Sequence, residues 1–145
     1  MRRIAPLLLL SLSLSIGCNA QDPMAGIAKS HIDGNVPDSD HFDEYLKRDL
    51  RDFLCKEKEG CRVEYSLLRD GPTQTGIAYP KFYVWVKCFQ KNGSVSEGAA
   101  RLAAIERKRF DVTDFLSREQ IKASPSQVRG VFPAALVDKI FERAG

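Results

Sequence analysis

Histidine is scarce in this chain, which has only His31 and His41 among its 145 residues. Hydrolysis by a serine or cysteine nucleophile requires a histidine held within hydrogen-bond distance of that nucleophile. His31 lies in a stretch rich in Asp, Gly, Pro and Ser, and His41 lies at the start of a predicted helix. Neither place offers the rigid support that a catalytic base needs, so we expect a protein that is not an enzyme.

The sequence also lacks the usual motifs for a metal ion or cofactor. Carboxylates gather around Asp33, but a calcium loop beginning there would place Pro37 at its fifth position, where an oxygen ligand is required. Cys55 and Cys61 are too far apart for a short zinc-binding pair, and they have no histidine beside them. We therefore expect no metal and no cofactor.

Long apolar runs are limited to residues 4–16, which follow Arg2 and Arg3. A helix that spans a bilayer needs about 20 apolar residues, so this run is too short to be one. A positive start followed by a short apolar run is typical of a secretory signal peptide. We expect residues 1–17 to be that peptide and the protein to be exported.

A strong excess of one charge is missing as well. The chain has 22 Lys and Arg residues against 19 Asp and Glu residues, a formal net charge of +3. Removal of residues 1–17 would take Arg2 and Arg3 away and leave 20 basic residues against 19 acidic ones. This balance gives no electrostatic reason to expect nucleic acid as a partner.

The apolar run ends at Ser15-Ile16-Gly17-Cys18. These residues resemble the lipobox of bacterial lipoproteins, in which a small residue precedes a cysteine that is lipidated on its thiol. The usual pattern has Leu three positions before the cysteine, where this chain has Ser15. The resemblance implies a membrane anchor at Cys18 on the periplasmic side of the envelope, and Asn19 in place of Asp implies the outer membrane. The alternative is cleavage after Ala20, which would release a secreted soluble protein.

Two regions follow the predicted signal peptide. Residues 18–40 are rich in Asp, Asn, Gly, Ser and Pro, a composition that predicts a flexible tether. Residues 41–145 are long enough for one domain with its own core, and we expect a single domain there.

The pattern of apolar residues predicts the first elements of this domain. Spacings of three and four predict an amphipathic helix over residues 42–54, with Ser39 or Asp40 as its N-cap. Alternation with a period of two predicts strands over residues 61–67 and 81–90.

Residues 95–116 fit either a helix or a strand, and their parity favours a long strand or a hairpin that turns near Arg107-Lys108. Short helices are expected after it, one from Ser117 and two that start at Ser124-Pro125 and Phe132-Pro133. The order predicts an α+β fold in which the first helix packs on a curved antiparallel sheet of three or four strands. In element order this resembles cystatin-like folds.

Cys55, Cys61 and Cys88 remain after either cleavage, an odd number in an oxidising compartment. We expect one disulfide and one thiol. The favoured pair is Cys55–Cys61, because a chain reversal between them would bring both together. Cys61–Cys88 stays open, since a register that sets Leu67 opposite Phe82 would also pair these two cysteines.

The second predicted strand also presents a candidate binding face. Its members are amphipathic aromatic and cationic residues on one side of the sheet, namely Lys81, Tyr83, Trp85 and Lys87, to which a neighbouring strand could add Arg101 and Arg107. Either this face is open to a ligand, or the C-terminal helices cover its aromatic residues.

Together these features favour a lipid-anchored binding protein of the cell envelope, with a protein or glycan partner. One specific version is an inhibitor or immunity protein that blocks an envelope enzyme. The alternative is an accessory structural subunit of an envelope assembly.

Overall fold

A computed structural model describes residues 22–55 and 59–145. The predicted signal peptide and Cys18 lie outside these residues. The helices are α1 (Pro23–Asn35), α2 (Ser39–Leu54), α3 (Arg118–Ala123), α4 (Pro125–Val131) and α5 (Ala134–Ala144). The strands are β1 (Arg62–Leu67), β2 (Lys81–Phe89), β3 (Val95–Ile105) and β4 (Arg109–Ser117). The predicted α+β class is confirmed.

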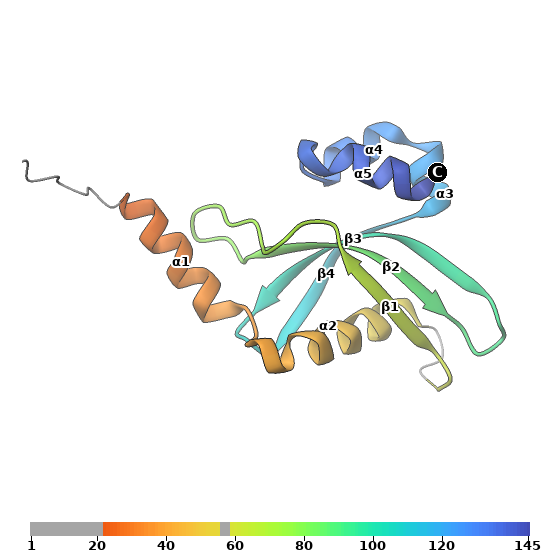
Figure 1. The fold of residues 1–145 in the computed structure, drawn as a ribbon, viewed down its shortest axis with the longest axis horizontal. Helices are drawn as coiled ribbons and strands as arrows, with labels where there is room; N and C mark the ends of the chain where they lie inside the picture. The colour runs from red at the N-terminus through yellow and green to blue at the C-terminus, as the bar shows by residue number, and fades with distance from the viewer. Residues whose placement is uncertain (1–21, 56–58) are drawn as a thin grey trace, which may run out of the picture.

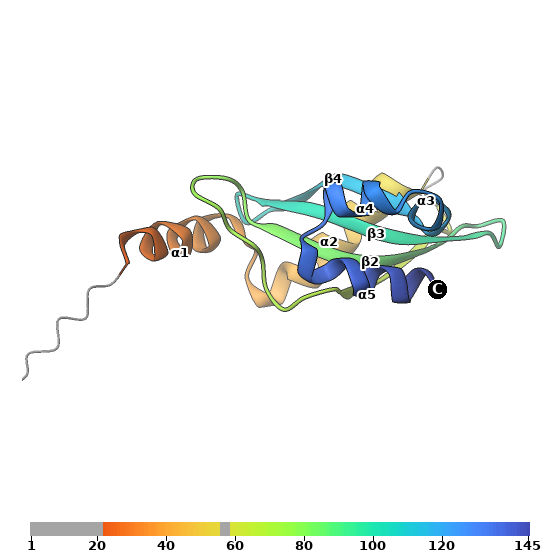
Figure 2. The same ribbon diagram turned by 90° about the horizontal axis from the view of Figure 1, so that it is seen from above.

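The four strands form one curved sheet in the order β1-β2-β3-β4, and every neighbouring pair is antiparallel. Helix α2 lies on one face of the sheet, and α3, α4 and α5 lie on the other (Figures 1 and 2). Successive side chains of β2 point to opposite faces of the sheet, and both faces carry apolar side chains. Each face is therefore stabilised by helices that exclude water from it.

The face of the sheet beneath α2 holds the first core. Leu46 and Leu50 of α2 are fully buried against Phe82, Val84 and Val86 of β2. The spacing of the helical residues turns one stripe of α2 toward the sheet, as the sequence predicted. The N-cap of α2 is not one of the two predicted residues.

Asp38 takes that role instead, since its side chain accepts a hydrogen bond from the backbone N–H of His41 at 3.2 Å. The predictions of Ser39 and Asp40 were therefore displaced by one or two residues, an error that arises because all three residue types make good N-caps.

Residues 95–116 form β3 and β4, which confirms the strand interpretation with its hairpin. The chain reverses at Glu106 and Arg107, both of which have positive φ angles, of 50° and 61°. The three C-terminal helices are also confirmed. Ser117 and Gln120 form a capping box at the start of α3, which fixes the direction in which the chain leaves the sheet.

The segment predicted as a flexible tether contains a helix. Asp22 caps α1 by accepting from the N–H of Met24 at 3.0 Å, and Pro23 occupies the first turn, where its missing N–H is not needed. None of the residues of α1 is fully buried, and the helix extends away from the rest of the molecule (Figures 1 and 2). No helix among the described residues combines the length and apolar character that a membrane span requires.

Candidate functional site

The predicted binding face is covered. The side chains of Tyr83 and Trp85 are only 5% and 3% exposed, because both lie in a core shared with α3, α4 and α5. The Tyr83 hydroxyl pairs with Thr73 Oγ1 at 2.9 Å, and the Trp85 indole N–H donates to Glu97 at 3.2 Å. The open version of this face is therefore wrong, and the covered version is confirmed.

The cationic members of that face make internal contacts. Lys87 Nζ lies 3.7 Å from a carboxylate oxygen of Glu97. Arg101 pairs with Asp114 at 2.6 Å and also donates to the backbone carbonyl of Val131 at 3.1 Å, which ties α4 to the sheet. Burial, followed by repulsion from Arg101, lowers the pKa of Lys81.

Arg107 lies elsewhere, at the β3–β4 turn, where it pairs with Asp38 at 3.7 Å. Its side chain therefore joins the hairpin to the start of α2 and does not extend the predicted face. Lys87, Arg101 and Arg107 thus contact carboxylates of other elements.

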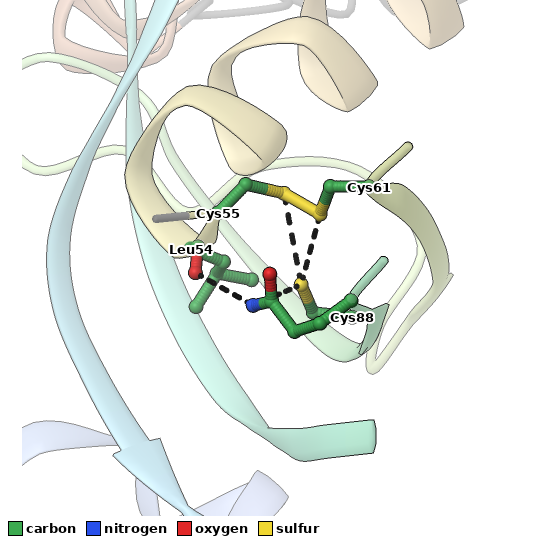
Figure 3. Close-up of a disulfide and its surroundings, with 5 residues drawn as sticks. Leu54, Cys55, Cys61 and Cys88 are labelled. Carbon is green, nitrogen blue, oxygen red and sulfur yellow. Dashed lines mark hydrogen bonds between the residues drawn. A yellow bond between two sulfur atoms is a disulfide. The ribbon is translucent and has the colours of Figure 1, made fainter. Parts of the chain in front are cut away.

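The structure brings the three domain cysteines together instead (Figure 3). Cys55 ends α2, and its N–H donates to the Arg51 carbonyl at 2.9 Å. Gly60 then adopts a φ of 74°, which favours glycine, and Cys61 follows just before β1. Cys55 and Cys61 form a disulfide, the pairing that the sequence favoured.

Cys88 of β2 is the third member, and its side chain points toward the disulfide (Figure 3). The register that would have paired Cys61 with Cys88 differs from the observed one by two residues: Leu67 faces Val84, and Cys88 faces Val63. Cys88 consequently lies diagonally across from Cys61. Cys55 is 8% exposed and belongs to the core beneath α2.

The Cys88 sulfur is in contact with both disulfide sulfurs. It lies 3.3 Å from Cys61 Sγ and 3.7 Å from Cys55 Sγ. Gln90 Nε2 lies 3.3 Å from the same sulfur and 3.4 Å from the carbonyl of Leu54, so one amide bridges α2 and β2. Burial raises the pKa of the Cys88 thiol, against a smaller opposing effect of Ser96.

Two surface grooves flank this cluster. The first, here called the hairpin groove, has a volume of about 470 Å³ and is lined by Leu54, Gln90, Lys91, Asn92, Ser94, Val95 and Ser96. The second, here called the basic groove, has a volume of about 440 Å³ and is lined by Glu44, Lys47, Arg48, Arg51, Cys61, Arg62 and Val63. The partly exposed Cys61 is the cysteine that reaches a groove surface.

Most cations of the basic groove are neutralised. Lys47 pairs with Asp43 at 2.8 Å, Arg48 pairs with Asp49 at 2.8 Å, and Arg62 pairs with Glu64. Within residues 22–55 and 59–145, the guanidinium of Arg51 has no carboxylate partner. Arg51 lines the same groove as Cys61.

The three sulfurs are also the group best placed to hold a metal ion in the described part of the chain, with all ligand atoms within 4.8 Å of one another. Metal ions bind thiolates, however, and two of these sulfurs are joined to each other. In the disulfide form the cluster offers a metal only Cys88. Its available chemistry is therefore thiol–disulfide chemistry.

Sequence reasoning identified the three cysteines but not their convergence. The neighbours Gln90 and Arg51 gave no signal, because nothing in the spacing shows that they flank a sulfur cluster. Fold and site together define a small α+β domain with a thiol beside a disulfide. Comparisons with protein-family models, with curated proteins and with solved structures found no match.

Proposed function

We propose that this chain is an exported, lipid-anchored binding protein of the bacterial envelope. The observation that carries the proposal is the pattern of Arg2-Arg3, the apolar run of residues 4–16 and the Gly17-Cys18 pair. The Cys55–Cys61 disulfide supports it, because disulfides form and persist in oxidising compartments such as the periplasm.

Helix α1 supports an anchored arrangement. Its cap, Asp22, lies four residues after Cys18, a stretch of chain that reaches at most about 14 Å. The 13 residues of α1 add about 20 Å.

At its other end, α1 is fixed to the domain. Asn35 Oδ1 accepts from the N–H of Glu106 at 3.1 Å, and the Asn35 carbonyl accepts from the N–H of Arg107 at 2.8 Å. In the proposed arrangement α1 is a stiff spacer that holds the domain a short distance from the membrane. Such a spacer would orient the domain, which a fully flexible tether would not.

The binding surface must lie outside the covered sheet face, and we assign it to the hairpin groove. Phe53 and Val95 are 54% and 56% exposed; Val95 lines this groove, and Phe53 precedes its lining residue Leu54. Apolar side chains beside a polar rim are typical of protein interfaces. The partner in this proposal is an envelope enzyme, which the domain inhibits by occupying part of its surface.

A pull-down from envelope extract with the full chain tests the binding role. The test variant is Phe53→Ser combined with Val95→Ser. The matched control is Ile77→Ser, since Ile77 is 83% exposed in the loop between β1 and β2 that lies at the α1 end of the molecule (Figure 1).

We expect the wild-type chain and the control to capture an envelope hydrolase at equal stoichiometry, and the double variant to lose it. Capture by the double variant at the wild-type level would contradict the assignment of the surface. Recovery of a multi-subunit membrane complex in place of a single enzyme would favour the accessory-subunit alternative.

A further inference from the structure

We propose that Cys88 and the Cys55–Cys61 disulfide form an internal thiol–disulfide exchange centre that delivers a reactive thiol to Cys55 at the end of α2. Disulfide-bearing molecules are the class of partner that such a thiol would take. The proposal rests on the geometry of the domain and is independent of the lipid anchor.

The position of Cys88 makes exchange possible without large movement. Its sulfur touches both disulfide sulfurs and is nearer to Cys61, at 3.3 Å, than to Cys55, at 3.7 Å. The two distances are similar, so the thiol lies beside the disulfide bond and not along its axis. Attack requires an approach along that axis, which a rotation of the Cys61 side chain would provide. Cys61 is partly exposed.

The reaction conserves atoms and electrons. Cys88 loses its proton, and its thiolate attacks Cys61 Sγ. The Cys61–Cys88 bond forms as the Cys55–Cys61 bond breaks, and Cys55 leaves as a thiolate that takes up a proton. One disulfide and one thiol are present before and after the step, so no external oxidant or reductant is needed.

Exchange changes where the thiol is found. Cys88 is 1% exposed in a central strand, between β1 and β3, where a partner molecule has no access. Cys55 is 8% exposed at the end of α2, one turn after Arg51, and it directly follows the hairpin groove residue Leu54. The guanidinium of Arg51 lines the groove that Cys61 also lines, and positive charge close to a thiol favours the thiolate form, which is the form that attacks disulfides.

A Cys55 thiolate would then react with a partner disulfide. The Cys55 sulfur bonds to one partner sulfur, and the other partner sulfur leaves as a thiolate. The interior form with Cys88 free is the resting state, and exchange is the step that makes the protein reactive.

The rate should depend on pH through Cys88. Because burial raises the pKa of this thiol, little thiolate is present at neutral pH and exchange is slow. The thiolate fraction grows about tenfold per pH unit until the pKa is reached, so the exchange rate should rise about tenfold per unit as well.

Labelling of the folded full chain with N-ethylmaleimide at mildly alkaline pH tests the proposal. Trypsin cuts after Arg3, Lys29, Lys56, Arg62 and Lys87 and therefore places the four cysteines of the full chain, Cys18 included, on separate peptides. Digestion without reduction then shows which cysteine carries the label and which two are joined.

We expect the label on Cys55 and a disulfide between the Cys61 and Cys88 peptides. Label on Cys88 with Cys55–Cys61 intact would overturn the proposal, and so would the absence of label from Cys55, Cys61 and Cys88 until the chain is denatured. Cys88→Ala is the background control, since it has no thiol to exchange.

A second variant tests the alternative pairing directly. In Cys55→Ser the two remaining sulfurs of the cluster should form Cys61–Cys88 in the folded chain, which lowers the mass by about 2 Da relative to the reduced protein. Free thiols at both Cys61 and Cys88 in a folded Cys55→Ser variant would overturn the proposal. Circular dichroism shows whether the Cys55→Ser variant is folded. If the variant is unfolded, the labelling of the wild-type chain alone decides the proposal.

Discussion

Trp85 and Glu97 are joined beneath the C-terminal helices: the indole N–H donates to a carboxylate oxygen of Glu97 at 3.2 Å. Arg118, the first residue of α3, donates to the other carboxylate oxygen at 2.6 Å and to the carbonyl of Ala144 at 2.7 Å. One carboxylate therefore connects the sheet to both ends of the C-terminal helical layer. This connection, with the apolar contacts around it, converts the predicted binding face into an interior.

Removal of the charge on Glu97 should loosen that layer. Glu97→Gln retains the shape of the side chain but weakens its bond to Arg118, and we expect a loss of about 1–2 kcal/mol in the free energy of unfolding. Urea unfolding followed by Trp85 fluorescence measures it. Glu142→Gln, at an exposed position of α5, is the control and should change stability by less than about 0.5 kcal/mol. Equal effects of the two substitutions would contradict the assigned role of Glu97.

The same carboxylate predicts a pH dependence. Burial acts to raise the pKa of Glu97, but hydrogen bonds from Trp85 and Arg118, with the charges of Lys87 and Arg118, outweigh it, and the net pKa lies below its ordinary 4.5. A lowered pKa stabilises the fold above the unfolded-state value, and that stability is lost as the pH falls through the folded-state value. Unfolding free energies measured from pH 6 to pH 3 should fall less steeply for Glu97→Gln than for the wild type. Parallel curves would contradict this.

Gly98 marks the close approach of β3 and β4. A Cβ at this position would overlap the carbonyl oxygen of Leu116 and lie 2.9 Å from the Phe115 ring. Gly98→Ala should therefore cost about 1–3 kcal/mol of stability. Gly130 of α4 has nothing within 4 Å of the same hypothetical atom, so Gly130→Ala should stabilise the protein by about 0.5 kcal/mol. Thermal unfolding of the Gly98→Ala and Gly130→Ala variants measures both changes in stability. Changes of the same sign in the two variants would contradict the close approach at Gly98.

The attachment of α1 can be tested through Asn35. Asn35→Ala removes the side-chain acceptor of the Glu106 N–H, so hydrogen exchange at that amide should become faster by about tenfold. Exchange in β2 should not change. Asp33→Ala, an exposed substitution on the same helix, is the matched control. Unaltered exchange at Glu106 in the Asn35 variant would show that the Asn35 side chain does not hold that amide.

The comparison of sequence and structure shows which signals are local. The alternation in residues 81–88 correctly divided β2 into two faces, and the parity of residues 100–112 correctly predicted β3 and β4. Both succeed because a strand side chain points to a face that its own position fixes. Whether Tyr83 and Trp85 are buried depends on where α3, α4 and α5 pack. The local sequence pattern around the two residues does not contain that information.

One signal could have settled that question. Leu136, Val137 and Ile140 form an apolar stripe on α5 that needs a partner surface, and the face of Tyr83 and Trp85 was the one left without cover once α2 was placed. The sulfur cluster was harder to predict, because a register two residues away would have placed Cys88 directly opposite Cys61. Helix α1 was not predicted because its composition is typical of a loop. The signals for a helix are its N-cap Asp22 and the proline in its first turn.

The most direct test of the account is whether Cys18 carries lipid. Cells expressing the full chain are grown with radiolabelled palmitate, and the protein is isolated as wild type, as Cys18→Ser and as the control Cys88→Ser. The account predicts label in the wild type and in Cys88→Ser and its loss in Cys18→Ser, since the lipid is attached to that one sulfur. Equal labelling of Cys18→Ser, or an unlabelled wild-type chain, would contradict the proposal of a membrane-anchored protein.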